Sequence, residues 1–366
     1  MNPPTFEELV QAYFNCRRTK RNSASALRFE LHLERNLAQL FDELLTGEYR
    51  PGRSICFVVT RPKPREVWAA DFRDRIVHHL LYNRVGPGIE RKFIADSCAC
   101  IPGRGTLYAG RRLEKKIRSA TQNWQRPGFY LKCDLANFFV AIDKRVLHWQ
   151  LANLITDSWW FDLAEMILMH DPRSNYEMQG HRRLLDLVPR HKRLTEQPSH
   201  LGLPIGNLSS QFFANIYLHD LDCFVKHRLH AKHYIRYVDD FVILHRSSET
   251  LNWWHGHIEQ FLPRLGAALN PRKTVLQPVA RGVDFVGHVI KPWRRTTRRK
   301  TVNLAVQRTM EAPPDELRDT ANSYFGLLRQ ASHSHADRAR LARAILRRGR
   351  SVDASLTRTY HVNHYQ

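Results

Sequence analysis

Residues 234–245 read YIRYVDDFVILH, two apolar runs on either side of the adjacent carboxylates Asp239 and Asp240. The aromatic and β-branched residues predict two antiparallel strands joined by a tight turn that carries both carboxylates. Two adjacent carboxylates repel each other, so something positive should lie beside this turn. A divalent cation fits, because hard oxygen ligands suit magnesium. The ordinary alternative, a solvated Asp-Asp turn, is the better interpretation of the dipeptide taken alone.

A third carboxylate, Asp134, ends a short apolar run in residues 130–139, YLKCDLANFF. This run predicts a buried strand whose last residue can point toward the aspartate turn. Together the three carboxylates would form a site for two Mg²⁺ ions, with Mn²⁺ as a second candidate ion. Two ions in such a site activate a 3′-hydroxyl and stabilise the pyrophosphate that leaves.

The charge of the chain indicates a polyanionic partner. The chain has 366 residues, with 57 Lys and Arg against 35 Asp and Glu, a net charge of +22. Such an excess is typical of proteins that bind nucleic acid, although an anionic membrane surface or a ribosome-type scaffold would also select it. No stretch approaches the roughly 20 apolar residues of a membrane span. The six cysteines form no Cys-x-x-Cys pair, so we expect reduced thiols, no zinc site and a cytoplasmic protein.

Outside these two stretches, the patterns alternate between helix and strand periodicity, which predicts a mixed α/β (α+β) chain. Residues 5–46 predict two helices, the second capped by Ser25, and a very basic piece after residue 290 also has a helical pattern. The other predicted elements are a hairpin at 48–65, a helix at 70–84, a long helix at 209–226 and a strand at 284–290.

Six motifs in a fixed order resemble the reverse transcriptase family. KCDLANFF and YVDDF resemble its palm motifs A and C, and LPIGNLSSQ at residues 203–211 stands where the family carries motif B. Upstream, PKPREVWAADFRDRIVHH (62–79) and DSCACIPGRGT (96–106) resemble the fingers motifs. Downstream, Lys273 and VDFVGHVI (283–290) match the last palm motifs. The resemblance covers residues 50–290.

This resemblance implies a right-hand polymerase with fingers, a palm built on an antiparallel sheet flanked by helices, and a helical thumb. Residues 1–49 would be a helical extension, 50–125 the fingers and 126–290 the palm. Residues 171–202 look like an insertion in the palm, between motifs A and B. The basic residues 291–366 would then be the thumb and tail.

The resemblance also implies a role for each candidate site residue. Asp134 and Asp239 would bridge both metal ions, with Asp240 beside them and the backbone carbonyl of Leu135 as a further ligand. Phe139 matches the residue whose ring excludes a ribose 2′-hydroxyl, whereas the adjacent Phe138 is the better candidate for a core residue.

The remaining candidates would contact the nucleotide and its phosphates. Lys63 and Arg65 match residues that clamp the triphosphate through charge-assisted hydrogen bonds, although solvated charges on a hairpin are the alternative. Lys273 matches a residue thought to protonate pyrophosphate, and a lysine that only contacts phosphate would look the same. Ile205, Gly206 and Gln211, all in motif B, are the other expected nucleotide-binding residues.

Motif B also suggests a subtype. Many family members have Gln at the position of Ile205 and Pro at that of Gln211. The form Ile-Gly-x-x-x-Ser-Gln resembles the reverse transcriptases of diversity-generating retroelements, which misincorporate opposite adenine. The sequence has no recognisable ribonuclease H, endonuclease or maturase segment. A related antiphage-defence reverse transcriptase is the alternative.

The expected partners are template RNA, a primer, the cDNA product and dNTPs, with a small basic accessory protein or a noncoding RNA as a further candidate. The template–primer duplex would lie against a basic run in the thumb, where phosphate contacts make binding depend on salt. This run contains Arg294, Arg295, Arg298, Arg299 and Lys300.

Two other functions compete with a reverse transcriptase. An RNA-directed RNA polymerase shares the palm and the paired aspartates, but Phe139 and the YxDD form argue against it. A non-catalytic RNA-binding scaffold has no need of three converging carboxylates and of Lys273.

Overall fold

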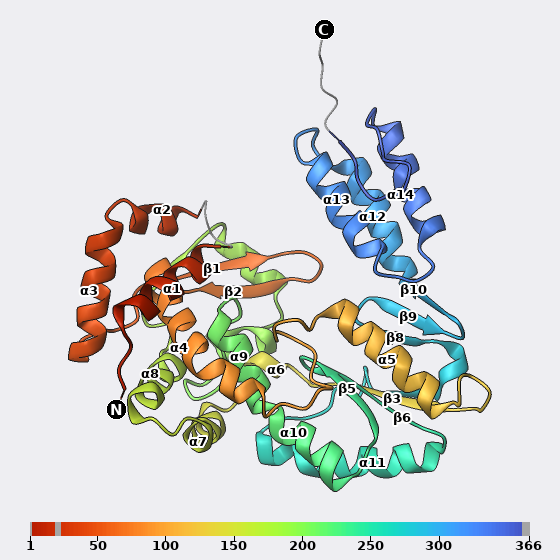
Figure 1. The fold of residues 1–366 in the computed structure, drawn as a ribbon, viewed down its shortest axis with the longest axis horizontal. Coiled ribbons are helices and arrows are strands. Elements are labelled where there is room, and N and C mark those ends of the chain that lie inside the picture. Colours follow the sequence, from red (N-terminus) through yellow and green to blue (C-terminus); the bar gives the residue numbers. More distant parts are fainter. Residues whose placement is uncertain (1, 19–22, 361–366) are drawn as a thin grey trace.

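The computed structural model describes residues 2–18 and 23–360. A central sheet of four antiparallel strands has the order β5-β6-β3-β7 and lies in the lower right of Figure 1. The strands are β3 (Phe129–Asp134), β5 (His233–Tyr237), β6 (Asp240–His245) and β7 (Val275–Pro278). The hairpin predicted from YIRYVDDFVILH is therefore confirmed as β5 and β6, and the strand that ends at Asp134 as β3.

Both faces of the central sheet are covered. Along β6, Phe241 and Ile243 pack into one apolar cluster, while Val242 and Leu244 pack into a second cluster on the other face. Helix α11 (Ser248–Phe261) covers the first face and α5 (Thr106–Ala120) the second. Because successive side chains of a strand point to opposite faces, a sheet buried on both sides requires the unbroken apolar run FVIL. The antiparallel sheet flanked by helices confirms the predicted fold class.

A second sheet of three strands has the order β2-β1-β4. Strands β1 (Ser54–Val59) and β2 (Arg65–Ala69) form an antiparallel hairpin, and β4 (Tyr176–Met178) pairs with β1 in parallel. The hairpin predicted at 48–65 thus spans residues 54–69, a few residues later in the chain. Pro62 and Pro64 lie in the turn before the first residue of β2, because proline supplies no N–H for the ladder. The third strand comes from the segment predicted to be an insertion.

Helices surround these sheets, and three of them form the N-terminal region where two were predicted. Leu31 is exposed at the break between the second and third, and Ser23, not Ser25, caps the second by accepting a hydrogen bond from the Ala26 N–H. These helices are α1 (Phe6–Arg17), α2 (Ala24–Glu30) and α3 (Leu33–Thr46). The others before the central hairpin are α4 (Phe72–Glu90), α6 (Phe138–Ala141), α7 (Lys144–Leu154), α8 (Ser158–Met169), α9 (Leu208–Tyr217) and α10 (His219–Cys223).

The long helix predicted at 209–226 is broken. This segment consists of α9, a bend at Leu218, α10 and a π-helical turn, Phe224–Arg228. The segment 171–202 has only short 3₁₀ turns besides β4. These are Arg182–Leu187, Arg190–Lys192 and Leu194–Glu196.

The C-terminal part begins with a third sheet, not with a helix. The predicted strand 284–290 is two strands joined at Val286 and Gly287, and the basic run continues into a third strand. They are β8 (Val283–Phe285), β9 (His288–Lys291) and β10 (Arg294–Thr297). The boundary expected at residue 290 therefore falls inside β9, because the hairpin that β9 forms with β10 joins the two sides.

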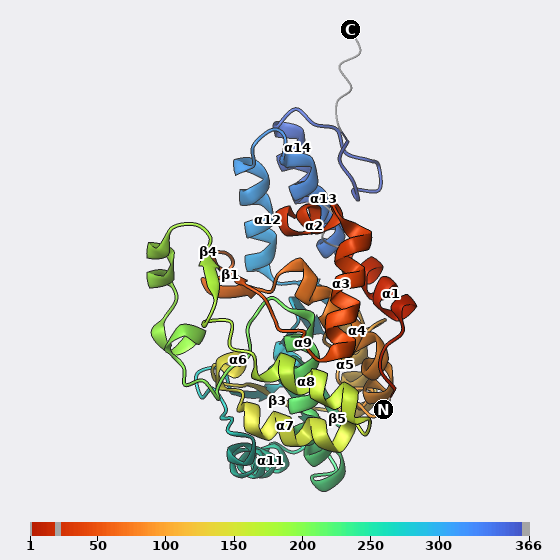
Figure 2. The same ribbon diagram turned by 90° about the vertical axis from the view of Figure 1, so that its left-hand side faces the viewer.

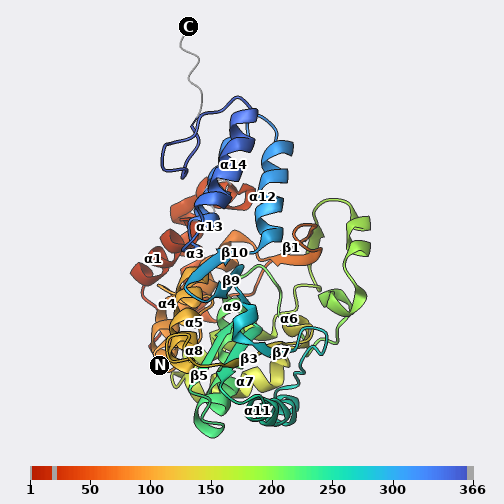
Figure 3. The same cartoon turned by 90° about the vertical axis from the view of Figure 1, so that its right-hand side faces the viewer.

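Three helices follow this sheet and pack around their own apolar core, which includes Val302, Phe325 and Leu341. They are α12 (Arg299–Glu311), α13 (Leu317–Leu328) and α14 (His335–Arg347). These helices stand beyond β10, apart from the central sheet (Figure 3). Residues 361–366 of the expected tail lie outside the described residues. Within residues 2–18 and 23–360, no helix combines the length and apolarity needed to cross a membrane.

Candidate active site

The turn between β5 and β6 presents the paired aspartates. Tyr237 and Asp240 are cross-strand partners, so the turn has only two central residues, Val238 and Asp239. Val238 has φ +56°, a conformation that a β-branched residue rarely adopts. The Arg236 guanidinium donates a hydrogen bond of 3.0 Å to the Val238 carbonyl oxygen and so holds the strained turn from below.

Strand β3 brings the third carboxylate to the same end of the sheet. Asp134 is the cross-strand partner of Asp240, and the Leu135 N–H donates to the Asp239 carbonyl oxygen at 3.1 Å. Two segments more than one hundred residues apart therefore place three carboxylates side by side. One segment supplies Asp134, and the other supplies Asp239 and Asp240.

The carboxylates of this site are short of positive charge. Two lysines neutralise part of the negative charge. Lys273 Nζ lies 2.6 Å from Asp134 Oδ1, and Lys132 Nζ lies 3.2 Å from Asp240 Oδ2. Burial still raises the pKa of Asp240 to about 6, against the effect of Lys132. Burial and the charge of Asp134 raise the pKa of Asp239. An additional cation would favour the ionised forms of these side chains.

The chemistry of the donors suits a hard divalent cation, because all three side chains offer only carboxylate oxygens. Asp240 Oδ1 is buried and has no hydrogen-bond partner in the described residues. In the same part of the chain, no three His, Cys, Asp or Glu side chains are already grouped as metal ligands. The lysine contacts explain why the three carboxylates are not grouped around one point, since Asp134 and Asp240 each turn one oxygen toward an ammonium group. The residues thus fit a metal ion, but the described conformation is not the liganded one.

A cavity of about 780 Å³ opens above the carboxylates. Both Phe138 and Phe139 line it, but Phe139 is partly buried, whereas Phe138 is only 4% exposed and packs in the main core. Candidate residues from five separate motifs share this lining. Besides the aspartates and Lys273, the lining includes Lys63, Arg65, Leu135, Phe139, Ile205, Gly206 and Gln211.

Motif B reaches the cavity by docking along β2. The Trp68 N–H donates to the Ile205 carbonyl oxygen at 2.8 Å, and the Ala70 N–H donates to Asn207 Oδ1 at 3.0 Å. Gly206 has φ +135°, and a Cβ there would lie 2.7 Å from the Trp68 carbonyl oxygen. Only glycine allows this close backbone approach, so the glycine positions the Ile205 side chain at the cavity.

The basic run after residue 291 divides into different environments. Arg294, Arg299 and Lys300 are exposed, and Arg298 lines the cavity in an ion pair with Asp284. Arg295 was expected to contact the duplex, but it is 5% exposed. Its guanidinium lies 2.9 Å from Glu114 and also donates to the Gln330 carbonyl oxygen. Arg295 therefore joins α5 to the C-terminal part and offers no free surface to a phosphate.

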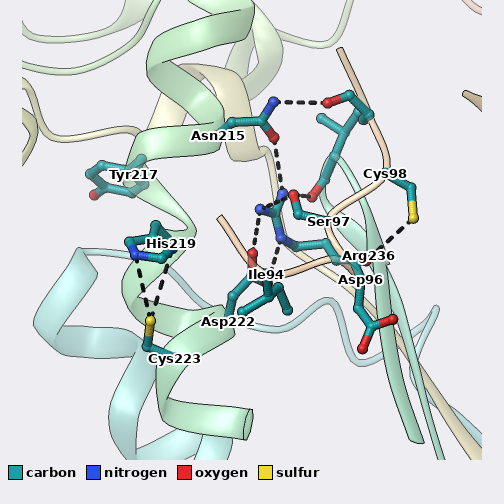
Figure 4. A network of polar contacts seen from close by, with 12 residues as sticks. Ile94, Asp96, Ser97, Cys98, Asn215, Tyr217, His219, Asp222, Cys223 and Arg236 are labelled. Carbon is teal, nitrogen blue, oxygen red and sulfur yellow. Dashed lines mark hydrogen bonds and ion pairs between the residues drawn. The ribbon is translucent and has the colours of Figure 1, made fainter. Parts of the chain in front are cut away.

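A buried ionic network under the aspartate turn was not predicted (Figure 4). Asp222 accepts two hydrogen bonds from Arg236, at 2.8 and 2.7 Å, and one from the Tyr234 hydroxyl at 2.7 Å. Arg236 also donates to Ser97 Oγ at 2.9 Å and to Asn215 Oδ1 at 3.3 Å. The only signal in the sequence is an arginine at an inward position of an apolar strand, because its partners lie on other elements.

Comparisons with known proteins place this site in a family. The family model described as "Reverse transcriptase (RNA-dependent DNA polymerase)" matches residues 61–290, and no curated protein matches the chain. Among solved structures, the telomerase of Candida albicans in complex with a TWJ fragment of telomeric RNA is 15% identical, with a TM-score of 0.48. It is matched over 82% of this chain and 54% of its own.

A second solved structure, apo telomerase from Candida tropicalis truncated from its C-terminal domain, is 14% identical, with a TM-score of 0.49 over 71% of this chain and 59% of its own. The chain thus spans less than two thirds of the length of these telomerases. The family model, by contrast, covers more than half of the chain and includes all three aspartates. The chain therefore belongs to the reverse transcriptase family.

Proposed function

We propose that this chain is an RNA-directed DNA polymerase that makes cDNA by two-metal nucleotidyl transfer. The observation that carries the proposal is the meeting of Asp134, Asp239 and Asp240 at the floor of a cavity whose walls are basic and aromatic. A non-catalytic RNA-binding scaffold would gain nothing from three converging carboxylates, because they repel the phosphates that it must bind.

In the proposed reaction, the three aspartates and the Leu135 carbonyl hold two Mg²⁺ ions, with Mn²⁺ as a substitute. The ions, when bound, activate the primer 3′-hydroxyl and stabilise the leaving pyrophosphate. Lys63 and Arg65 orient the triphosphate through charge-assisted hydrogen bonds. Lys273 donates a proton or a hydrogen bond to the pyrophosphate oxygens. Phe139 closes the space beside C2′ of the incoming sugar, while Ile205 and Gln211 face the nascent base pair.

The variant Asp239→Asn tests this proposal. Asparagine keeps the size of the side chain and removes the charge that holds the metal, so primer extension on an RNA template should fall by at least about a hundredfold, the scale of one lost preorganised electrostatic contact. Binding of the template RNA should stay within about twofold, because Asp239 contacts no phosphate of the duplex in the proposed arrangement.

The exposed Asp42→Asn on α3 is the matched control, with the same chemical change far from the cavity. Near-wild-type extension by Asp239→Asn would exclude the two-metal assignment. Extension by the wild type with ribonucleotides as efficient as with deoxyribonucleotides would instead favour an RNA-directed RNA polymerase.

For the biological role we propose mutagenic copying in a diversity-generating retroelement, with antiphage defence as the alternative. The support is Ile205, which cannot hydrogen-bond and lies in the lining of the cavity. A template repeat beside a variable gene in the genomic neighbourhood would favour the retroelement, and defence genes there would favour the alternative.

The proposed partners are template RNA, a primer and dNTPs, with a small basic accessory protein or a noncoding RNA as a further candidate. Exposed Arg294, Arg299 and Lys300 would contact the duplex phosphates. We retain the proposed division into an extension (1–49), fingers (50–125), palm (126–290) and thumb with tail (291–366), with β9 crossing the last boundary. Five cysteines, namely Cys56, Cys98, Cys100, Cys133 and Cys223, have free thiols, which accords with a proposed cytoplasmic location.

A further inference from the structure

The segment 171–202 forms one wall of the active-site cavity. Four of its residues, Leu187, Val188, Pro189 and Lys192, share the cavity lining with the aspartates. The segment extends from β4 beside the β1–β2 hairpin, on the α6 side of the molecule (Figure 2). The segment therefore contributes side chains to the same cavity as the aspartates.

The segment is fixed at both sides of the site. On the β2 side, the Leu194 N–H donates to the Glu66 carboxylate at 2.5 Å, one residue after Arg65. On the α6 side, the Gly202 N–H donates to the Ile142 carbonyl oxygen at 2.8 Å, and the N–H of the next residue, Leu203, donates to the Phe139 carbonyl oxygen at 2.8 Å. The segment therefore joins the proposed triphosphate clamp to the proposed sugar gate.

Internal contacts make the wall rigid around Lys192. Arg173 donates to the carbonyl oxygens of Leu194, at 3.0 Å, and Gln197, at 2.5 Å, and pairs with Asp171. Val188 and Leu194 are 1% and 5% exposed, so the turn that carries Lys192 is anchored on each side by a buried residue. A preorganised backbone lowers the entropic cost of binding a ligand.

Lys192 itself is exposed and makes no ion pair within the described part of the chain. Two cations of the cavity are engaged, because Lys273 pairs with Asp134 and Arg298 pairs with Asp284. Lys63 and Arg65, like Lys192, line the cavity. Lys192 thus adds a free ammonium group to the wall that joins Arg65 to Phe139, where the proposed function places the incoming nucleotide.

We infer that Lys192 is a further nucleotide-binding residue, whose ammonium group hydrogen-bonds the phosphates of the incoming dNTP. This inference rests on the proposed function. The same phosphate chemistry occurs in the template backbone, but the contacts of this segment with β2 and α6 favour the nucleotide.

Steady-state primer extension by Lys192→Ala, Lys192→Arg and Arg190→Ala tests the inference. Arg190 is the matched control, because it is an exposed cation in the same 3₁₀ turn and does not line the cavity. We expect Lys192→Ala to raise KM for dNTP about tenfold, the effect of one charge-assisted hydrogen bond, with kcat within about twofold. Lys192→Arg should recover most of the loss, and Arg190→Ala should match the wild type.

Equilibrium binding of a nonhydrolysable dNTP analogue to the protein–template–primer complex gives a readout that does not depend on turnover. Its Kd should rise in parallel with KM, while Kd for the template–primer stays unchanged. Unchanged nucleotide binding in Lys192→Ala would overturn the inference, and so would a weaker template–primer affinity as the only change. A wild-type protein that binds the analogue but extends no primer would contradict the proposed function and leave this inference standing.

Discussion

Phe138 and Phe139 show how neighbouring residues of one type can have different environments. The rings of Phe138 and Phe139 lie 5.4 Å apart in an edge-to-face arrangement. Phe138 also packs against Tyr217 in the core, so it supports Phe139 from behind. The pair explains why a half-buried ring can keep one position at the wall of the cavity.

We predict that Phe139→Val admits ribonucleotides. Removing the ring opens space for a 2′-hydroxyl, and the ratio of kcat/KM for dNTP over rNTP should fall by about one to two orders of magnitude. Single-nucleotide extension with both nucleotide types measures this ratio. An unchanged ratio with normal dNTP incorporation would remove Phe139 as the gate.

Ile205 combines a fixed backbone with a side chain that cannot form hydrogen bonds. We predict that Ile205→Gln improves fidelity by no more than about tenfold, because one neutral hydrogen bond contributes only ~0.5–1.5 kcal/mol. Sequencing of cDNA copies made by both versions measures the error at each template base. Accurate wild-type copies, including those opposite adenine, would contradict mutagenic copying and favour the defence alternative.

At the scale of elements, the network around Arg236 ties β5 to α10 and to the loop before α5. Arg236 and Asp222 are 1% and 0% exposed, so the pair is fully removed from water. The backbone adds two bonds, from the Arg236 N–H to the Asp96 carbonyl oxygen and from the Cys98 N–H to the Arg236 carbonyl oxygen, both 3.0 Å. The strand that leads into the aspartate turn is therefore held by buried hydrogen bonds to two neighbouring segments.

We predict that Asp222→Asn lowers the free energy of unfolding by about 3–5 kcal/mol, because the Arg236 charge would remain buried without its counterion. Urea denaturation measures this loss. Asp220→Asn is the matched control, since Asp220 is two residues away, only partly buried and bonded to the neutral Gln150. Equal stability of the two variants would show that Asp222 does not neutralise Arg236.

On the scale of the whole molecule, the net charge of +22 is distributed over several elements, and only part of it faces the proposed duplex. The helices α12 to α14 stand beyond the β8–β10 sheet (Figure 3). The exposed cations Arg294, Arg299 and Lys300 lie where this sheet meets α12.

We predict that replacing these three cations by alanine weakens template–primer binding and reduces its salt dependence. The slope of log K against log salt should become shallower by about two to three, at ~0.7–0.9 for each lost phosphate contact. Fluorescence anisotropy at several salt concentrations measures the slope. The control replaces three exposed arginines elsewhere, namely Arg28, Arg35 and Arg91. An equal effect of both triple variants would show that only overall charge matters.

The sequence alone determined the features that depend on neighbouring residues. The β5–β6 hairpin follows from two runs of aromatic and β-branched residues on either side of the paired aspartates, and the strand that ends at Asp134 follows from a short apolar run. The motifs identified the family for the same reason, because each is a contiguous stretch whose order along the chain can be read directly. The apolar periodicity did not predict the break between α2 and α3 or the break after α9.

Only the tertiary structure decided which charges meet. Arg295 stands in a run of similar basic residues, yet packing against Glu114, 181 residues earlier, makes it a buried structural residue. The environments of Arg236 and Lys192 also depend on other elements. Arg236 pairs with Asp222, and Lys192 lines a cavity that several elements form. The environment of a charged side chain depends on every element packed around it. For this reason the sequence predicted the carboxylates of the site, whereas the network beneath them and the wall beside them required the fold.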